Sequence, residues 1–168
     1  MILHLLERLS GFGITEFVVN LHHHAGKLQA YLESLKLPGV SIVFSHERDT
    51  LLDTGGALKR AASFFAGSSP FLIHNVDIQT SLAPGTLLTT HSQRDALATL
   101  AVRKRESSRY LLFDSEMRLC GWKNVKTGEK IIVNEPEEEL TPLAFSGVQI
   151  VSPELFEHFP SANRFSLI

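Results

Sequence analysis

Residues 71–77 read Phe71-Leu72-Ile73-His74-Asn75-Val76-Asp77, a short apolar run that leads directly into a turn with a carboxylate. An uninterrupted apolar run of this length is typical of a strand that is covered on both faces of its sheet. In open α/β sheets, ligands bind beyond the carboxyl ends of the strands. Asp77 is therefore a candidate ligand for Mg²⁺, which usually takes carboxylates together with substrate phosphates. An acidic cap of a simple turn is an equally good interpretation.

The segments around this run alternate between helical and extended patterns. Apolar residues at helical spacing predict helices from Ile2 to Leu9, from Leu28 to Leu35, from Leu58 to Phe65 and near 87–91. Apolar runs between them predict strands at 17–21, 40–44 and 96–102. Helix and strand in alternation favour a Rossmann-like, three-layer α/β/α fold with a mostly parallel sheet.

The last third of the chain has a different pattern. Residues 110–122 predict a β-hairpin, 130–133 another strand, and 143–151 a strand that rejoins the main sheet. Ser152 followed by Pro153 predicts the capped start of a short helix. No linker divides the chain, so we expect one domain over residues 1–168.

Composition limits the classes of partner. The chain has 168 residues, 43% hydrophobic and 20% charged, with a formal net charge of −2. Without a basic excess, nucleic acid is not an expected partner. Cys120 is the single cysteine, so an internal disulfide is excluded and a reducing cytoplasm is the expected location. The apolar runs are too short to span a bilayer, so no membrane association is expected.

A second candidate site is the glycine pair in residues 51–58. After a polar loop, Gly55 and Gly56 are expected to open a helix, where backbone N–H groups can face a ligand and a base or phosphate can approach closely. The alternative is a tight turn with Thr54 as the helix cap. By spacing alone this alternative is the stronger one.

Three further clusters favour ordinary structural roles. Consecutive histidines at 22–24 cannot all point one way, and tetrahedral zinc sites draw on separated positions, so a solvated loop is expected. The basic residues 103–105, with Arg109 nearby, could attract phosphate but more often mark a solvated strand end. Cys120 lies in the predicted hairpin beside Trp122 and is expected to pack in the interior.

Taken in order, four stretches resemble the sugar nucleotidyltransferases, and the similarity extends over nearly the whole chain. The subgroup it most resembles contains mannose-1-phosphate guanylyltransferases and N-acetylmuramate-1-phosphate uridylyltransferases. The matching stretches are a helix-to-strand segment, a base-binding loop, a strand that ends in the metal-binding aspartate, and a later strand with a Ser/Thr-Gly turn near the sugar. They correspond here to residues 11–20, 52–58, 71–77 and 145–150.

The resemblance implies Mg²⁺-assisted transfer of a nucleoside monophosphate from a nucleoside triphosphate to a sugar 1-phosphate, with release of pyrophosphate and no covalent enzyme intermediate. It implies that Asp77 holds the metal and is the catalytic residue. It further implies nucleotide contacts from Asp53, Gly55, Gly56 and Asn75, and sugar-phosphate contacts from Arg109, Ser146 and Gly147.

The chain also departs from the family pattern. The N-terminal strand and glycine-rich loop of the family, and its second metal-binding aspartate, have no counterpart in residues 1–168, and Val76 and Leu111 stand where the family often has glycine. We therefore expect a partial copy with little activity alone. The alternatives are a non-catalytic domain that binds nucleotide or sugar phosphate, and an oligomerisation module; self-association into a homo-oligomer is open.

Overall fold

The computed structural model describes residues 1–47, 50–67, 69–134 and 139–168. The helices are α1 (Ile2–Gly11), α2 (Ala25–Ser34), α3 (Asp53–Arg60) and α4 (Pro84–Arg94), with short 3₁₀ helices η1 (Ala62–Phe64) and η2 (Pro153–His158). The strands are β1 (Glu16–Leu21), β2 (Ser41–His46), β3 (Phe71–His74), β4 (Ala98–Arg103), β5 (Arg109–Phe113), β6 (Leu119–Asn124), β7 (Lys130–Ile132) and β8 (Thr141–Val151). The predicted alternation of helix and strand is thus confirmed, and the acidic stretch 135–138 lies outside the described residues.

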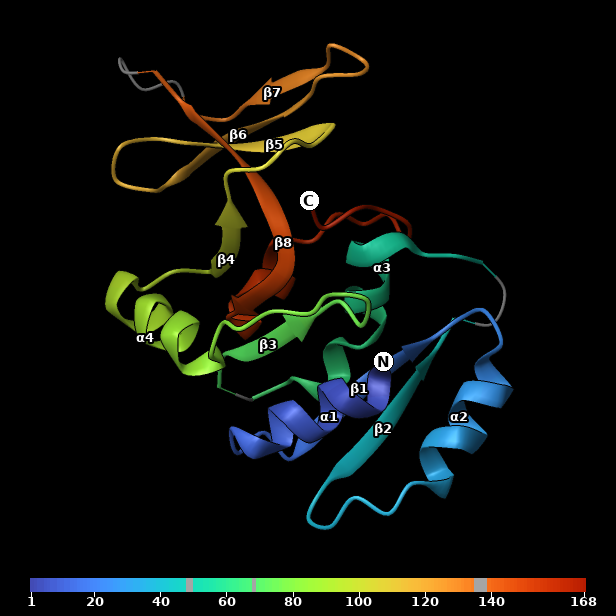
Figure 1. The fold of residues 1–168 in the computed structure, drawn as a ribbon. Coiled ribbons are helices and arrows are strands. Elements are labelled where there is room, and N and C mark those ends of the chain that lie inside the picture. Colours follow the sequence, from blue (N-terminus) through green and yellow to red (C-terminus); the bar gives the residue numbers. More distant parts are fainter. Residues whose placement is uncertain (48–49, 68, 135–138) are drawn as a thin grey trace.

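The strands form two separate sheets among the described residues (Figure 1). One contains only β1 and β2, which pair in parallel. The other follows the order β3-β8-β5-β6-β7, with β4 also pairing with β8, and all of its pairings are antiparallel. The expected parallel arrangement is therefore found only in β1–β2. The reason is β8, which returns along the sheet and takes both β3 and β4 as antiparallel neighbours.

The larger sheet is built around the eleven-residue strand β8. Its first half pairs with β5, next to the hairpin, and its second half pairs with β3 and β4. Val148 and Ile150 pack with Leu87 of α4 in one apolar cluster, and Leu143 packs with Leu111 and Phe113 in another. One continuous strand therefore belongs both to the part of the sheet with β3 and β4 and to the hairpin unit, which consists of β5, β6 and β7.

The hairpin turn is held by a buried carboxylate. Asp114 is 3% exposed, and its side chain accepts hydrogen bonds from the backbone N–H of Arg118 at 2.7 Å and from the Arg118 guanidinium at 2.7 Å. These two bonds lower the pKa of Asp114. Cys120 is buried in β6, as expected.

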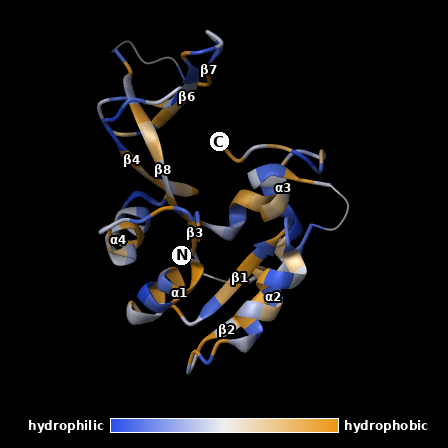
Figure 2. Ribbon diagram, turned by 45° about the vertical axis from the view of Figure 1, so that its right-hand side comes forward, coloured by the Kyte–Doolittle hydropathy of each residue, from blue (hydrophilic) through white to orange (hydrophobic). Residues whose placement is uncertain are grey.

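The hydropathy colouring marks much of β1 and β8 as hydrophobic (Figure 2). The stripe of α1 is buried at Leu6 and Leu9, as its helical spacing predicts. Strand β1 has partly buried residues at three successive positions, 17–19, so both of its faces are covered to some extent. The described part of the chain contains no helix with the length and apolarity that a bilayer crossing requires.

Candidate active site

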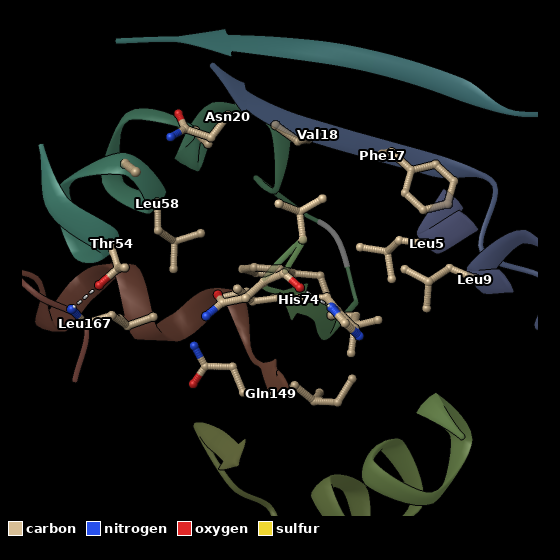
Figure 3. Close-up of a pocket in the computed structure, with 18 of the residues that line it drawn as sticks. Leu5, Leu9, Phe17, Val18, Asn20, Thr54, Leu58, His74, Gln149 and Leu167 are labelled. Atoms are coloured by element: carbon tan, nitrogen blue, oxygen red, sulfur yellow. Dashed lines mark hydrogen bonds between the residues drawn. The ribbon is translucent and has the colours of Figure 1, made fainter. Parts of the chain in front are cut away.

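An open cleft of about 2070 Å³ lies between the two sheets (Figure 3). Its walls come from α1, β1, α3, β3 and the start of β5. Apolar side chains form most of the wall, and its polar residues include Asn20 near the end of β1 and His74 at the end of β3. The predicted site residues that line the cleft are Asp53, Asn75, Asp77 and Arg109.

Asp77 is positioned by the turn that follows β3. The backbone N–H of Asn75 donates to the carbonyl oxygen of Gly147 at 2.9 Å, which ties the start of the turn to β8. The N–H of Ile78 then donates back to the carbonyl of Asn75 at 3.2 Å and closes the turn. Asp77 and Asn75 are both exposed. Within the described chain, no hydrogen bond or ion pair engages the Asp77 carboxylate.

Gly147 of β8 lies directly against this turn. It has a φ of +75°, and a Cβ there would lie 3.1 Å from Nδ2 of Asn75 and 2.7 Å from Cγ1 of Ile78. A residue without a side chain is therefore needed for Asn75 to lie against β8. Neither Gly147 nor Ser146 is among the residues that line the cleft. Gly147 is thus placed to support the turn rather than to face a ligand directly.

The glycine pair has a different environment from the expected one. Helix α3 begins at Asp53, so Gly55 and Gly56 lie inside the helix and are buried, and Leu52 rather than Thr54 is its N-cap. The backbone N–H groups of both glycines donate to the carbonyl oxygen of Phe165, at 3.0 and 3.2 Å. The expectation of free N–H donors here is therefore wrong: the C-terminal segment occupies them.

The close approach of this segment accounts for both glycines. A Cβ on Gly55 would collide with the Phe165 ring, and a Cβ on Gly56 would collide with the carbonyl oxygen of Asn163. Thr54 lies beside them and accepts a hydrogen bond from the N–H of Leu167 at 2.9 Å. The segment therefore docks on α3 through backbone contacts that side chains would block.

Asp53 lies at the entrance of α3 with a φ of +63°, a left-handed conformation that Asp tolerates better than most residues. Its Oδ1 accepts a hydrogen bond from the N–H of Thr54 at 2.7 Å. Asp53 remains exposed in the cleft wall. Arg109 is also exposed there, and Arg105 directs its guanidinium to the carbonyls of Glu106 and Phe145, each at 3.2 Å.

Sequence reasoning missed Glu47, a buried carboxylate that organises this end of the cleft. Glu47 is 5% exposed; its Oε1 accepts from Nδ2 of Asn20 at 2.6 Å and its Oε2 from the N–H of Leu52 at 2.8 Å. It thereby connects the end of β1 to the entrance of α3. The signal in the sequence was its place just beyond a predicted strand, the same criterion that selected Asp77.

The remaining clusters are as expected. Residues 22–24 are exposed in the loop between β1 and α2, and the rings of His23 and His24 lie 3.9 Å apart. The basic run 103–105 is exposed at the end of β4. In the described ranges, no group of three or more His, Cys, Asp or Glu residues is arranged to hold a metal ion.

Comparisons with known proteins agree with this architecture. The chain is 28% identical to the N-acetylmuramate alpha-1-phosphate uridylyltransferase of Caulobacter vibrioides over 98% of its own length and 67% of that protein. It is 33% identical to the mannose-1-phosphate guanylyltransferase catalytic subunit beta of Dictyostelium discoideum, over 66% of this chain but only 31% of that protein. The chain therefore spans two thirds or less of the length of these relatives.

Solved structures show the same fold. HddC from Yersinia pseudotuberculosis superposes with a TM-score of 0.71 at 20% identity, over 97% of this chain and 67% of that one. A protein from Bacillus anthracis, described as a putative glucose-1-phosphate thymidylyltransferase, superposes with a TM-score of 0.73 at 16% identity, over 96% of this chain and 64% of that one. The family model described as "Nucleotidyl transferase" matches residues 1–117, and the chain therefore belongs to the nucleotidyl transferase family.

Proposed function

We propose that this chain provides part of the active site of a sugar-1-phosphate nucleotidyltransferase. In the reaction, a phosphate oxygen of the sugar 1-phosphate forms a bond to the α-phosphorus of a nucleoside triphosphate. The bond from the α-phosphorus to the bridging oxygen breaks, and pyrophosphate leaves with that oxygen. Family membership supports this reaction class. The observation that carries the proposal is the exposed Asp77 carboxylate, which lies in the cleft wall without a protein partner in the described chain.

Asp77 is suited to Mg²⁺. A single carboxylate at the end of a strand, next to space for phosphate oxygens and water, matches the usual coordination of this ion. Bound Mg²⁺ would neutralise the charge of the phosphates at the reacting phosphorus. Asn75, exposed beside Asp77, offers an amide that can donate to a phosphate or a base.

The other cleft residues have complementary roles in the proposal. Asp53 offers a carboxylate acceptor for nucleotide N–H or O–H groups, at the entrance of α3. The guanidinium of Arg109 can bind the phosphate of the sugar 1-phosphate through paired hydrogen bonds. Gly147, and Ser146 before it, act through the turn that carries Asn75 and Asp77. The N–H groups of Gly55 and Gly56 can contribute to nucleotide binding only when the C-terminal segment dissociates from α3, because the carbonyl of Phe165 otherwise occupies both.

A second candidate is a domain that binds nucleotide or sugar phosphate without turnover. The observation that favours it is the occupation of both glycine N–H donors by the Phe165 carbonyl. The two candidates differ in one measurable property. An enzyme releases pyrophosphate from UTP or GTP when Mg²⁺ and N-acetylmuramate 1-phosphate, mannose 1-phosphate or glucose 1-phosphate are present, whereas a binding domain only shows heat of binding.

Titration calorimetry with UTP and GTP, with Mg²⁺ and with EDTA, tests the role of Asp77. We expect Asp77→Asn to remove most of the Mg²⁺-dependent part of nucleotide binding, because the neutral amide lacks the charge with which a carboxylate holds this cation. Asp95→Asn is the matched control, because Asp95 is exposed at the end of α4 with a φ of 47°, which Asn accepts readily. Equal Mg²⁺-dependent binding by Asp77→Asn and the wild type would contradict the proposed metal site.

A further inference from the structure

The hairpin unit presents one face of its sheet to the cleft. In the register of β5 and β6, Leu111 lies directly opposite Trp122, and residues in such a pair share a face. Arg109 lies two residues before Leu111, and because side chains alternate along a strand it belongs to the same face. All three residues line the cleft. A cation and an aromatic ring on adjacent strands therefore border the same space.

Trp122 provides a fixed aromatic surface on this face. Its side chain is partly buried and packs against the apolar cluster of Leu111, Phe113 and Leu143. This packing holds the indole in place in the absence of any ligand. Among the residues that the structure describes, none accepts a hydrogen bond from the indole N–H, which can therefore donate to a ligand. An apolar ring with one donor at its edge suits a ligand that is apolar on one face and polar at its rim.

Arg109 places a positive charge beside this ring. Its side chain is exposed, and within the described ranges its guanidinium has no hydrogen-bond or ion-pair partner. Arg109 pairs with Asn124, two residues along β6 from Trp122, so Arg109 and Trp122 are diagonal neighbours. Such neighbours are about 7–8 Å apart, within reach of one ligand for two long side chains. A guanidinium binds phosphate through paired hydrogen bonds, so the ligand should carry a phosphate next to its stacked ring.

The residues before β5 leave Arg109 as the cation for this ligand. Arg105 already directs its guanidinium to the carbonyls of Glu106 and Phe145. Oγ of Ser107 accepts from the N–H of Arg109 at 3.3 Å, which leaves the proton of this hydroxyl for a further acceptor. Ser107 also lines the cleft. The polar groups beside the indole are thus mainly donors, as an anionic and hydroxylated ligand requires.

We propose that Trp122 is a sugar-binding residue of this cleft: the indole stacks on the C–H face of a hexose ring, and Arg109 binds the phosphate on C1 of the same sugar. This inference rests on the proposed function, because it assigns the sugar 1-phosphate of that reaction to the wall formed by the hairpin unit. A hexose has C–H groups on its ring faces and hydroxyls at its rim, which matches an indole with an N–H at its edge. A nucleobase also stacks on aromatic rings, but its phosphates are separated from it by the ribose.

The fluorescence of Trp122 reports this contact directly, because Trp122 is the only tryptophan of the sequence. We expect at least one of mannose 1-phosphate, glucose 1-phosphate and N-acetylmuramate 1-phosphate to move the emission to shorter wavelength, since a stacked sugar displaces water from the indole. Inorganic phosphate, which lacks the ring, should not shift the emission, and neither should UTP or GTP. Calorimetry on the same samples shows independently whether each compound binds.

Three variants separate a sugar contact from a purely structural role of the indole. Trp122→Leu keeps an apolar side chain against Leu111 and should weaken binding of the sugar 1-phosphate about tenfold, with binding of inorganic phosphate unchanged. Arg109→Gln should weaken binding of both. Ile131→Ala is the control and should change neither affinity: Ile131 lies directly opposite Trp122 in β7, but it is 52% exposed and does not line the cleft.

The results distinguish this proposal from the proposed function. If calorimetry shows that a sugar 1-phosphate binds while the emission of Trp122 stays constant, the stacking contact is overturned and the proposed function stands. Equal losses of sugar-phosphate and phosphate affinity in Trp122→Leu, or an equal emission shift with UTP or GTP, also overturn it. If no sugar 1-phosphate binds at all, both proposals fail. If Trp122→Leu does not fold, the emission of the wild type decides.

Discussion

Replacing Gly56 by alanine tests the structural role of the glycine pair. A Cβ at position 56 would collide with the carbonyl oxygen of Asn163 and would lie 2.9 Å from Cβ of Leu52. Because the backbone of the C-terminal segment is the obstacle, a rotamer change cannot relieve the collision. We expect Gly56→Ala to release this segment from α3.

The expected destabilisation follows from the hydrogen bonds that are lost. The carbonyl of Phe165 accepts from Gly55 and Gly56, and the N–H of Phe165 donates to the carbonyl of Leu52 at 3.2 Å. At about 1 kcal/mol each, these bonds contribute about 3 kcal/mol. Alanine inside a helix returns up to about 1 kcal/mol relative to glycine. The net loss is about 2 kcal/mol, which lowers the midpoint of thermal unfolding by about 4–8 °C for a chain of this size.

Urea unfolding and limited trypsin digestion measure the two parts of this prediction. The urea midpoint reports the loss of stability, and cleavage after Arg164 reports release of the segment. Gly26→Ala is the control: it makes the same change inside α2, where a Cβ has nothing within 4 Å, and should be neutral or slightly stabilising. A Gly56→Ala protein with wild-type stability and a protected C-terminal segment would refute the reasoning.

Two further substitutions test other contacts. His91 is 3% exposed between the hydroxyls of Thr99 at 3.0 Å and Ser152 at 2.8 Å, and burial lowers its pKa against the opposing effect of Asp95 and Glu154. The neutral His91 ring therefore stabilises the fold above the unfolded pKa of about 6.5, and this stabilisation is lost as pH falls through the folded pKa. We expect the urea midpoint to drop less between pH 8 and pH 5 in His91→Gln than in the wild type. Gly147→Ala should cost about 2 kcal/mol or more, because a left-handed residue with a Cβ costs about 1–2 kcal/mol before the contact with Ile78 is counted; unchanged urea unfolding would contradict the described turn.

Local pattern was enough to predict most of the secondary structure. The strand at 71–74 and the stripe of α1 agree with the structure, since both depend on apolar spacing that neighbouring segments do not alter. Pairing was harder to predict, because it depends on the path of the whole chain. Strand β8 looks the same in sequence whether its neighbours are parallel or antiparallel, and the structure has it antiparallel to β3, β4 and β5.

The candidate site was predictable where it depends on strand ends and not where it depends on distant contacts. Asp77 and Asn75 line the cleft because they follow β3 directly. The occupation of the glycine N–H groups could not be predicted, because their partner, Phe165, lies more than a hundred residues away. Ser152 is at the N-cap position of η2 with Pro153 next, as predicted, but its hydroxyl makes no capping hydrogen bond and instead contacts His91 and the carbonyl of Ala96, the latter at 3.2 Å.

The continuity of β8 has a mechanical consequence. One end of this strand anchors the hairpin unit through β5, and the other end runs between β3 and β4, with Gly147 in the stretch between. A tilt of the hairpin unit would act as a lever on this strand, with a hinge where the backbone already has a φ of +75°. Because the N–H of Asn75 is bonded to that hinge, such a tilt would shift the loop that carries Asp77 and change its distance from Arg109, which moves with the hairpin.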